Sequence, residues 1–201
     1  MCKWKVVSIG VLLALLSVRP GAVLAQDPQP PDAPTPTEPT IVETTRLKWV
    51  ETEDGKRQLV PVSSIESMQT VSIPSSSLQQ SDASPLSRFT ITMWRALAWH
   101  KNFLGHLFAE ARGRTSTDVT ADKLYVRIEH KWRSTPGSGW WNDAGWNART
   151  VENTTTTGIV PSGDWLTYAG YEHAAKGDHQ AKVYGQWYIY NDQWGPQRVI
   201  P

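Results

Sequence analysis

The sequence predicts an all-β protein: an antiparallel β-sandwich, jelly-roll or immunoglobulin-like, preceded by a signal peptide and a proline-rich disordered segment. Residues 124–132 alternate between apolar and polar side chains with a period of two, which is typical of a half-buried strand. Nine of the 11 tryptophans, and every tyrosine and phenylalanine, lie between positions 89 and 194. That stretch is long enough to build a core from large rings.

Residues 1–25 have the three-part pattern of a secretory signal. Lys3 and Lys5 precede an apolar run at 6–18, which is too short to cross about 30 Å of hydrocarbon as a helix, and small residues follow up to Ala25. We therefore expect a secreted, extracellular protein of bacterial origin with no stable membrane span after signal cleavage. The alternative is a chain anchored by an uncleaved signal segment.

The next two segments predict little packed structure. Residues 26–45 hold six prolines among polar residues, which predicts a disordered spacer. Residues 46–87 predict a loosely structured hairpin and a serine-rich linker. The pair Asp54-Gly55 suits the hairpin turn, and Pro61 restricts the second strand to a sheet edge. Within the linker, 63–87, only 68–73 is strand-like.

Residues 88–201 are expected to form the tryptophan-rich β-sandwich domain. Besides 124–132, strands are expected at 89–94, 164–171 and 181–190, with an exposed edge at 150–157. On 124–132 the buried side should carry His130 as a hydrogen-bonded core residue beside Trp132. On 181–190 we expect Val183, Trp187 and Ile189 on one face, and Tyr184, Tyr188 and Tyr190 on the other.

Residues 97–112 fit two patterns. Leu97, Leu104 and Phe108 lie on a helical stripe, whereas Trp99, Phe103 and Leu107 alternate as in a strand with Gly105 as a bulge. The segment 102–107, the strand that ends at Trp132, the threonine-rich stretch after it, Gly163-Asp164-Trp165 and 168–173 together resemble small exported bacterial β-sandwich proteins of unassigned activity. The resemblance covers roughly 89–189, implies that 97–112 is extended, and supplies no catalytic residue.

Charge and cysteine content exclude several classes of protein. Cleavage of the signal removes three bases and leaves 17 bases against 19 acids, which is not the basic footprint of a nucleic-acid binder. The single cysteine, Cys2, lies in the signal, so disulfides, zinc thiolates and a cysteine nucleophile are excluded from the mature chain. We expect no cofactor and no metal. The alternative is a metal site of Glu172, His173, Asp178 and His179 across a turn at 176–177.

The segment 136–147 places three indoles among glycines and small polar residues. The simpler expectation is that these rings fill the core. The alternative is a ligand surface, because a flat ring stacks on the C–H face of a sugar while amide and carboxylate groups bond its hydroxyls. In that case the ligand-binding residues are Trp140, Trp141, Asn142, Asp143, Trp146 and Asn147, extended by Trp165, Tyr168 and Trp194.

We expect an exported, non-catalytic protein that binds extracellular glycan or protein through exposed aromatic residues. One alternative is a secreted glycan-active enzyme that uses acids such as Glu129 or Asp164, although the sequence cannot show the carboxyl separation that such an enzyme needs. The other is a secreted toxin-like or bacteriocin-like polypeptide whose aromatic residues engage a membrane interface. Neither the ligand nor the oligomeric state follows from the sequence.

Overall fold

The computed structural model describes residues 34–51, 55–74, 88–102, 104–139 and 141–201. The predicted signal peptide, the first part of the predicted spacer and Trp140 lie outside these residues. The described part is all-β, as predicted, and holds nine strands and no helix. No helix in this part is therefore long and apolar enough to cross a membrane.

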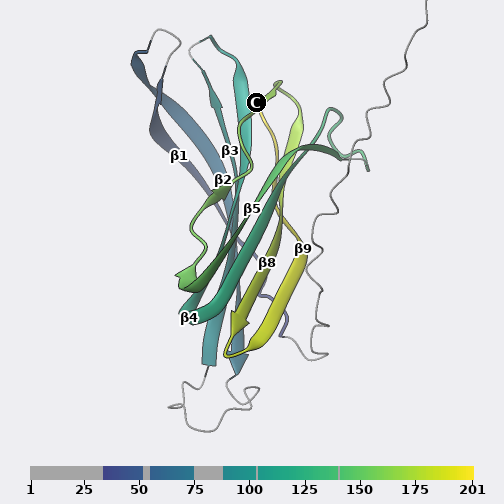
Figure 1. The fold of residues 1–201 in the computed structure, drawn as a ribbon. Helices are drawn as coiled ribbons and strands as arrows, with labels where there is room; N and C mark the ends of the chain where they lie inside the picture. The colour runs from purple at the N-terminus through teal and green to yellow at the C-terminus, as the bar shows by residue number, and fades with distance from the viewer. Residues whose placement is uncertain (1–33, 52–54, 75–87, 103, 140) are drawn as a thin grey trace, which may run out of the picture.

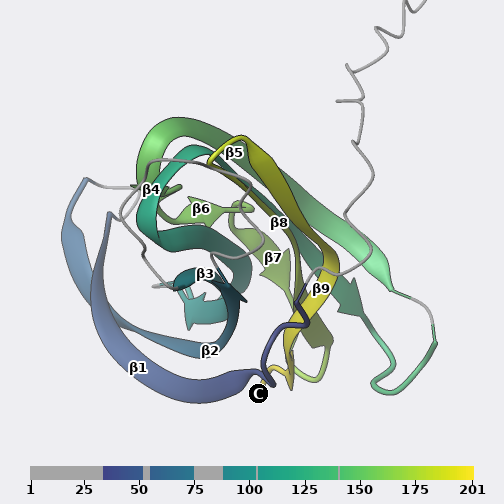
Figure 2. The same cartoon turned by 90° about the horizontal axis from the view of Figure 1, so that it is seen from below.

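The strands form one antiparallel sheet in the order β1-β2-β3-β4-β8-β9. These strands are β1 (Thr40–Glu51), β2 (Arg57–Pro74), β3 (Arg88–Lys101), β4 (Leu107–Arg133), β8 (Glu172–Val183) and β9 (Gln186–Val199). Strands β5 (Asn142–Thr156), β6 (Val160–Pro161) and β7 (Trp165–Thr167) pair in turn with β4. The sheet curls round on itself, so that β1 approaches β9 (Figures 1 and 2).

Strand β4 joins the two halves of the curl. Residues 107–117 pair with β3, whereas residues 123–133 pair with β8. The pairing of β4 with β5 shifts register between Ser116 and Ala121, where the partner on the opposite edge changes. A register irregularity lets a strand bend, so one long strand serves both halves.

The two halves face each other across the interior. Arg95 of β3 lies against β8 and β9: a Cβ built on Gly195 would come 3.0 Å from the Arg95 Cβ, and one built on Gly177 would come 3.2 Å from its Cδ. The largest apolar cluster packs between the halves and includes Ile91, Leu124 and Tyr188. Because both glycines lack a side chain, β3 can approach the opposite strands this closely.

The ends of the sheet are held together by side chains and by the segment that precedes β1. Arg198 Nη1 of β9 lies 3.0 Å from Glu43 Oε1 of β1. The Thr37 amide donates to the Thr70 carbonyl of β2 (2.9 Å), and Tyr190 Oη donates to the Pro34 carbonyl (3.4 Å). Residues 34–37 therefore bridge β2 and β9 beside the curl.

The first hairpin extends further than the sequence predicts. β1 and β2 pair as expected, but β2 continues through the predicted linker to Pro74, with Ile65, Val71 and Ile73 buried. β2 as a whole lies between β1 and β3, but residues 57–61 pair with β1 alone, so the predicted edge position holds at Pro61 and fails from Val62 onward. Pairing with β3 begins only at Val62, so the missing N–H of Pro61 removes no bond from that ladder.

The ambiguous segment 97–112 is extended. Residues 97–101 end β3 and residues 107–112 begin β4, so the helix alternative is wrong. Gly105 is not a bulge within one strand: it lies in the connecting turn with φ of +80°. Asn102 Oδ1 accepts the amides of Leu104 (3.0 Å) and His106 (2.9 Å), which fixes that turn.

The strand at 124–132 follows the predicted alternation, and His130 is fully buried. Residues 181–190 do not form one strand, because a turn at Tyr184 (φ +50°) and Gly185 (φ +79°) separates β8 from β9. Because two residues form this turn, the alternation of inward and outward side chains restarts at the beginning of β9. Tyr188 and Tyr190 therefore face the core together with Val183, contrary to the predicted faces.

Candidate ligand-binding face

The outward side of β5, β4, β8 and β9 carries a row of four cross-strand neighbours. Trp146 of β5 pairs with Glu129 of β4, Glu129 pairs with Lys176 of β8, and Lys176 pairs with Trp194 of β9. Directly paired residues project on the same side of a sheet. Because the neighbours of Glu129 on β4, Ile128 and His130, are buried, this row points away from the core.

We call this outward surface the aromatic face. It comprises Trp141, Trp146 and Trp194 with the charged residues Arg127, Glu129, Lys131, Arg133, Asp143, Glu172, Lys176 and Asp192. Trp146 is 63% exposed and Trp194 is 41% exposed. These exposures are too high for core residues, so the expectation that the indoles of 136–147 fill the core is wrong for Trp146.

Each indole of the aromatic face lies beside a cation. The Arg127 Cζ lies 5.0 Å from the Trp146 ring centroid, the Arg133 Cζ 4.2 Å from that of Trp141, and the Lys176 Nζ 5.9 Å from that of Trp194. Such contacts contribute about 0.5–1 kcal/mol at exposed sites. They orient the rings and occupy one side of each.

The Trp141 and Trp194 rings also contact each other. Their centroids are 5.5 Å apart and their planes are inclined by 45°. Trp141 comes from the loop before β5 and Trp194 from β9, so this pair joins segments that are distant in sequence. The two rings form one aromatic contact at the β9 end of the row.

The cations of the aromatic face are each paired with a carboxylate. Glu129 contacts Arg127 and Lys131, both at 2.8 Å, and Lys131 also contacts Asp143. Arg133 lies 2.7 Å from Glu172 and Lys176 lies 2.5 Å from Asp192. The network therefore balances four cations against four carboxylates.

The pKa shifts in this network follow from the pairing. Burial lowers the pKa of Lys131, but its hydrogen bonds to Asp143 and Glu129 outweigh burial and raise it overall. The hydrogen bond from Lys176 lowers the pKa of Asp192. Both shifts favour the ionised form, so the Lys131 ammonium and the Asp192 carboxylate are charged near neutral pH.

The remaining predicted ligand residues are dispersed. Asn142 and Asn147 are exposed on β5, but Asn147 Nδ2 donates to the Pro161 carbonyl (2.9 Å), which ties β5 to β6. Trp165 is 42% exposed on β7, opposite Ala109 on the first half of β4. Tyr168 packs on Tyr171 at 5.5 Å. Neither Trp165 nor Tyr168 belongs to the aromatic face.

The sequence reasoning missed the charged partners of the indoles, Arg127, Arg133 and Lys176. The signal was present, because Arg127, Glu129 and Lys131 alternate with buried residues in 124–132 and must point outward. What the sequence did not show is that β5 and β9 would bring tryptophans beside them.

Three histidines lie in the interior and not at a metal site. His130 Nε2 and His173 Nδ1 are 2.9 Å apart, and His173 Nε2 lies 2.8 Å from Thr167 Oγ1. Burial lowers the pKa of His130 to about 3 and that of His173 to about 4. His179 Nδ1 contacts Thr115 Oγ1 (2.9 Å), and burial holds the pKa of His179 well below its ordinary value.

The alternative metal site is not supported. The turn expected at 176–177 lies inside β8, so His173 and His179 remain six residues apart on one extended strand. Within the described residues, no three His, Cys, Asp or Glu side chains gather as a metal would require. Of the acids considered for an enzyme, Glu129 has each carboxylate oxygen bonded to a different cation.

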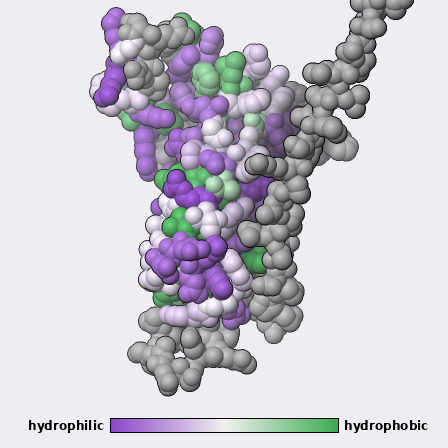
Figure 3. Space-filling model, viewed as in Figure 1, coloured by the Kyte–Doolittle hydropathy of each residue, from purple (hydrophilic) through white to green (hydrophobic). Residues whose placement is uncertain are grey.

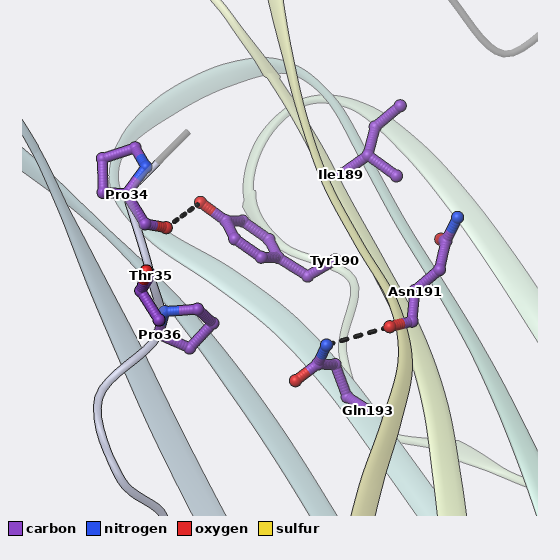
Figure 4. Close-up of a pocket in the computed structure, with 7 residues that line it drawn as sticks. All are labelled: Pro34, Thr35, Pro36, Ile189, Tyr190, Asn191 and Gln193. Carbon is purple, nitrogen blue, oxygen red and sulfur yellow. Dashed lines mark hydrogen bonds between the residues drawn. The ribbon is translucent and has the colours of Figure 1, made fainter. Parts of the chain in front are cut away.

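A cavity of about 400 Å³ lies between residues 34–36 and β9 (Figure 4). Tyr190 reaches the Pro34 carbonyl, and Gln193 Nε2 donates to the Asn191 carbonyl (2.9 Å). Burial raises the pKa of Tyr190 to about 12, so its hydroxyl remains a donor at neutral pH. None of the residues that line the cavity belongs to the aromatic face.

The surface seen in Figure 3 is mostly hydrophilic, with separated hydrophobic spots rather than one continuous apolar patch. Comparisons with protein-family models, with curated proteins and with solved structures found no match.

Proposed function

We propose that this chain is an exported, non-catalytic protein that binds extracellular glycan through the aromatic face. The observation that carries the proposal is the placement of Trp146 and Trp194 on one outward sheet surface, each beside a cation. Exposing large aromatic rings costs burial free energy, about 25 cal/mol per Å² of apolar surface. A surface that keeps two such rings in fixed orientations is suited to stacking on a ligand.

The chemistry favours sugar over an apolar partner. Stacking on an indole uses the C–H face of a pyranose, while the surrounding carboxylates, guanidinium and ammonium groups can bond its hydroxyls. A hydrophobic protein partner would instead bury these paired charges without replacing their hydration, which is costly. The aromatic face has the mixture of rings and polar groups that a polyhydroxylated ligand needs.

The N-terminal segments and the sheet architecture also support the proposal. The signal-like residues 1–25 and the proline-rich spacer would place the folded part outside the cell, where glycans are abundant. The two facing halves of the curled sheet would act as the layers of a sandwich, and the packing of Arg95 of β3 against Gly195 of β9 supports this description.

The test is retention of the purified protein on insoluble glycans, with cellulose and chitin as neutral matrices and an insoluble pectate as the acidic one. Wild type, Trp146→Ala and Trp194→Ala are compared with Trp165→Ala, which removes an indole outside the face that is about as exposed as that of Trp194. We expect both face variants to lose retention and Trp165→Ala to keep it. No retention of wild type on any matrix, or equal retention of all four proteins, would overturn the proposal.

A further inference from the structure

The ion pairs of the aromatic face bear on the class of glycan. Each of its four cations, Arg127, Lys131, Arg133 and Lys176, already contacts a carboxylate. The two most exposed carboxylates, Asp143 and Asp192, have side chains that are 77% and 74% exposed. A polyanionic ligand would have to displace these carboxylates from their cations and would be repelled by them.

The pairing register bears on the direction of the ligand. Trp146 and Trp194 stand at the two ends of the row that crosses β5, β4, β8 and β9, with Glu129 and Lys176 between them. Three interstrand spacings separate the ends, which amounts to about 14 Å. One sugar unit cannot contact rings that far apart, whereas an oligosaccharide laid perpendicular to the strands can.

The middle of the row, between the two indoles, supplies polar groups that a bound sugar chain can contact. Glu129 and Lys176 are held by neighbouring ion pairs, so their orientation is fixed before a ligand arrives. Fixed groups lose little side-chain entropy on binding. A chain that stacks at both ends would therefore meet preorganised acceptors and donors at its centre.

From these observations, and resting on the proposed function, we infer that the aromatic face binds a neutral polysaccharide chain that runs across the strands from Trp146 to Trp194. The ligand contacts indole rings at both ends and, in the middle, the cross-strand neighbours Glu129 and Lys176. Trp141, which lies beside Trp194, widens the second stacking position.

The experiment is isothermal titration calorimetry with oligosaccharides of one to six units. Two neutral series, β-1,4-linked glucose and β-1,4-linked N-acetylglucosamine, are compared with α-1,4-linked galacturonate. We expect the affinity for one neutral series to rise with length until both indoles are spanned and then to level off. Galacturonate oligomers should bind at least about tenfold more weakly, and neutral binding should stay within about twofold between about 0.05 and 0.5 M NaCl.

Variants separate the two ends of the row. Trp146→Ala and Trp194→Ala should each lower the affinity for the hexamer by about tenfold or more and abolish the gain with length. Trp146→Tyr, which keeps a stacking ring, should retain most of that gain. The matched control is Trp49→Ala, because Trp49 of β1 is also 63% exposed but lies outside the face, and it should bind as wild type does.

The outcomes distinguish this inference from the proposed function. Tighter binding of galacturonate than of both neutral series, or neutral binding without dependence on length, would overturn the inference and leave glycan binding in place. Equal effects of Trp49→Ala and Trp146→Ala would also overturn it. Absence of binding by all three series would overturn the inference together with the proposed function.

Discussion

Substitution of Gly195 by alanine tests how closely the two halves of the curled sheet approach. A Cβ at this position would lie 3.0 Å from the Ala175 carbonyl oxygen and 3.0 Å from the Arg95 Cβ. Both atoms belong to, or are attached directly to, strand backbone, so neither can swing away as the end of a flexible side chain could. Accommodating the methyl group requires β9 to move relative to β3 or β8.

Overpacking of this kind costs about 1–3 kcal/mol. We therefore expect Gly195→Ala to lower the free energy of unfolding by that amount, and the melting temperature by about 2–4 °C per kcal/mol for a domain of this size. The assay is urea denaturation followed by tryptophan fluorescence. Gly139→Ala is the control, because a Cβ at Gly139 meets nothing within 4 Å. A stability loss below about 0.5 kcal/mol for Gly195→Ala would refute the close approach of β3 to β9.

Three further predictions concern the interior and one turn. His130 and His173 have pKa values of about 3 and about 4 in the fold, below the unfolded value of about 6.5, so their contribution to stability should be complete above pH 6.5 and be lost as the pH falls towards 4 and 3. His130→Gln should reduce this pH dependence in urea titrations; an unchanged slope would contradict the assignment. Arg95 is fully buried, its Nε and Nη1 lack hydrogen-bond partners, and burial lowers its pKa to about 10, so Arg95→Met should leave stability unchanged or raise it by about 1–3 kcal/mol. A fall in the free energy of unfolding of more than about 1 kcal/mol, measured by thermal denaturation, would contradict this prediction, because it would show that other groups compensate the buried Arg95 charge. Gly185→Ala should destabilise by about 1 kcal/mol, because Gly185 has φ of +79° in the β8–β9 turn, and an unaltered melting curve would argue against that turn.

The fold class was predictable where side-chain alternation was strict. Residues 124–132 show it because one side of β4 packs on the core and the other faces outward. Strand β2 was predicted in two pieces, 58–62 and 68–73, and the part between them was missed, since its serines lower the hydrophobic contrast although Ile65 is buried. The β8–β9 turn was missed because Tyr184-Gly185 interrupts a run of β-forming residues without a stronger turn signal.

For the candidate site, the sequence predicted which aromatic residues could take part but not which of them lie together on one surface. Sequence placed Trp141 and Trp146 together because they are close along the chain, and it added Trp165 and Trp194 by composition. Only the strand order separates the last two: β9 lies in the same half as β5, whereas β7 pairs with the first half of β4. Long-range pairing of this kind depends on the whole sheet and leaves no local trace in the sequence.

The most direct test of glycan binding by the aromatic face is a solution NMR titration that follows the indole Nε1–H signals of the tryptophans. A neutral hexasaccharide from the series that binds is added to the ¹⁵N-labelled protein. We expect the signals of Trp146 and Trp194 to shift with saturation, and those of Trp49 and Trp165 to remain in place. Shifts confined to Trp49 or Trp165, or no shift at Trp146 and Trp194 at saturation, would contradict the account.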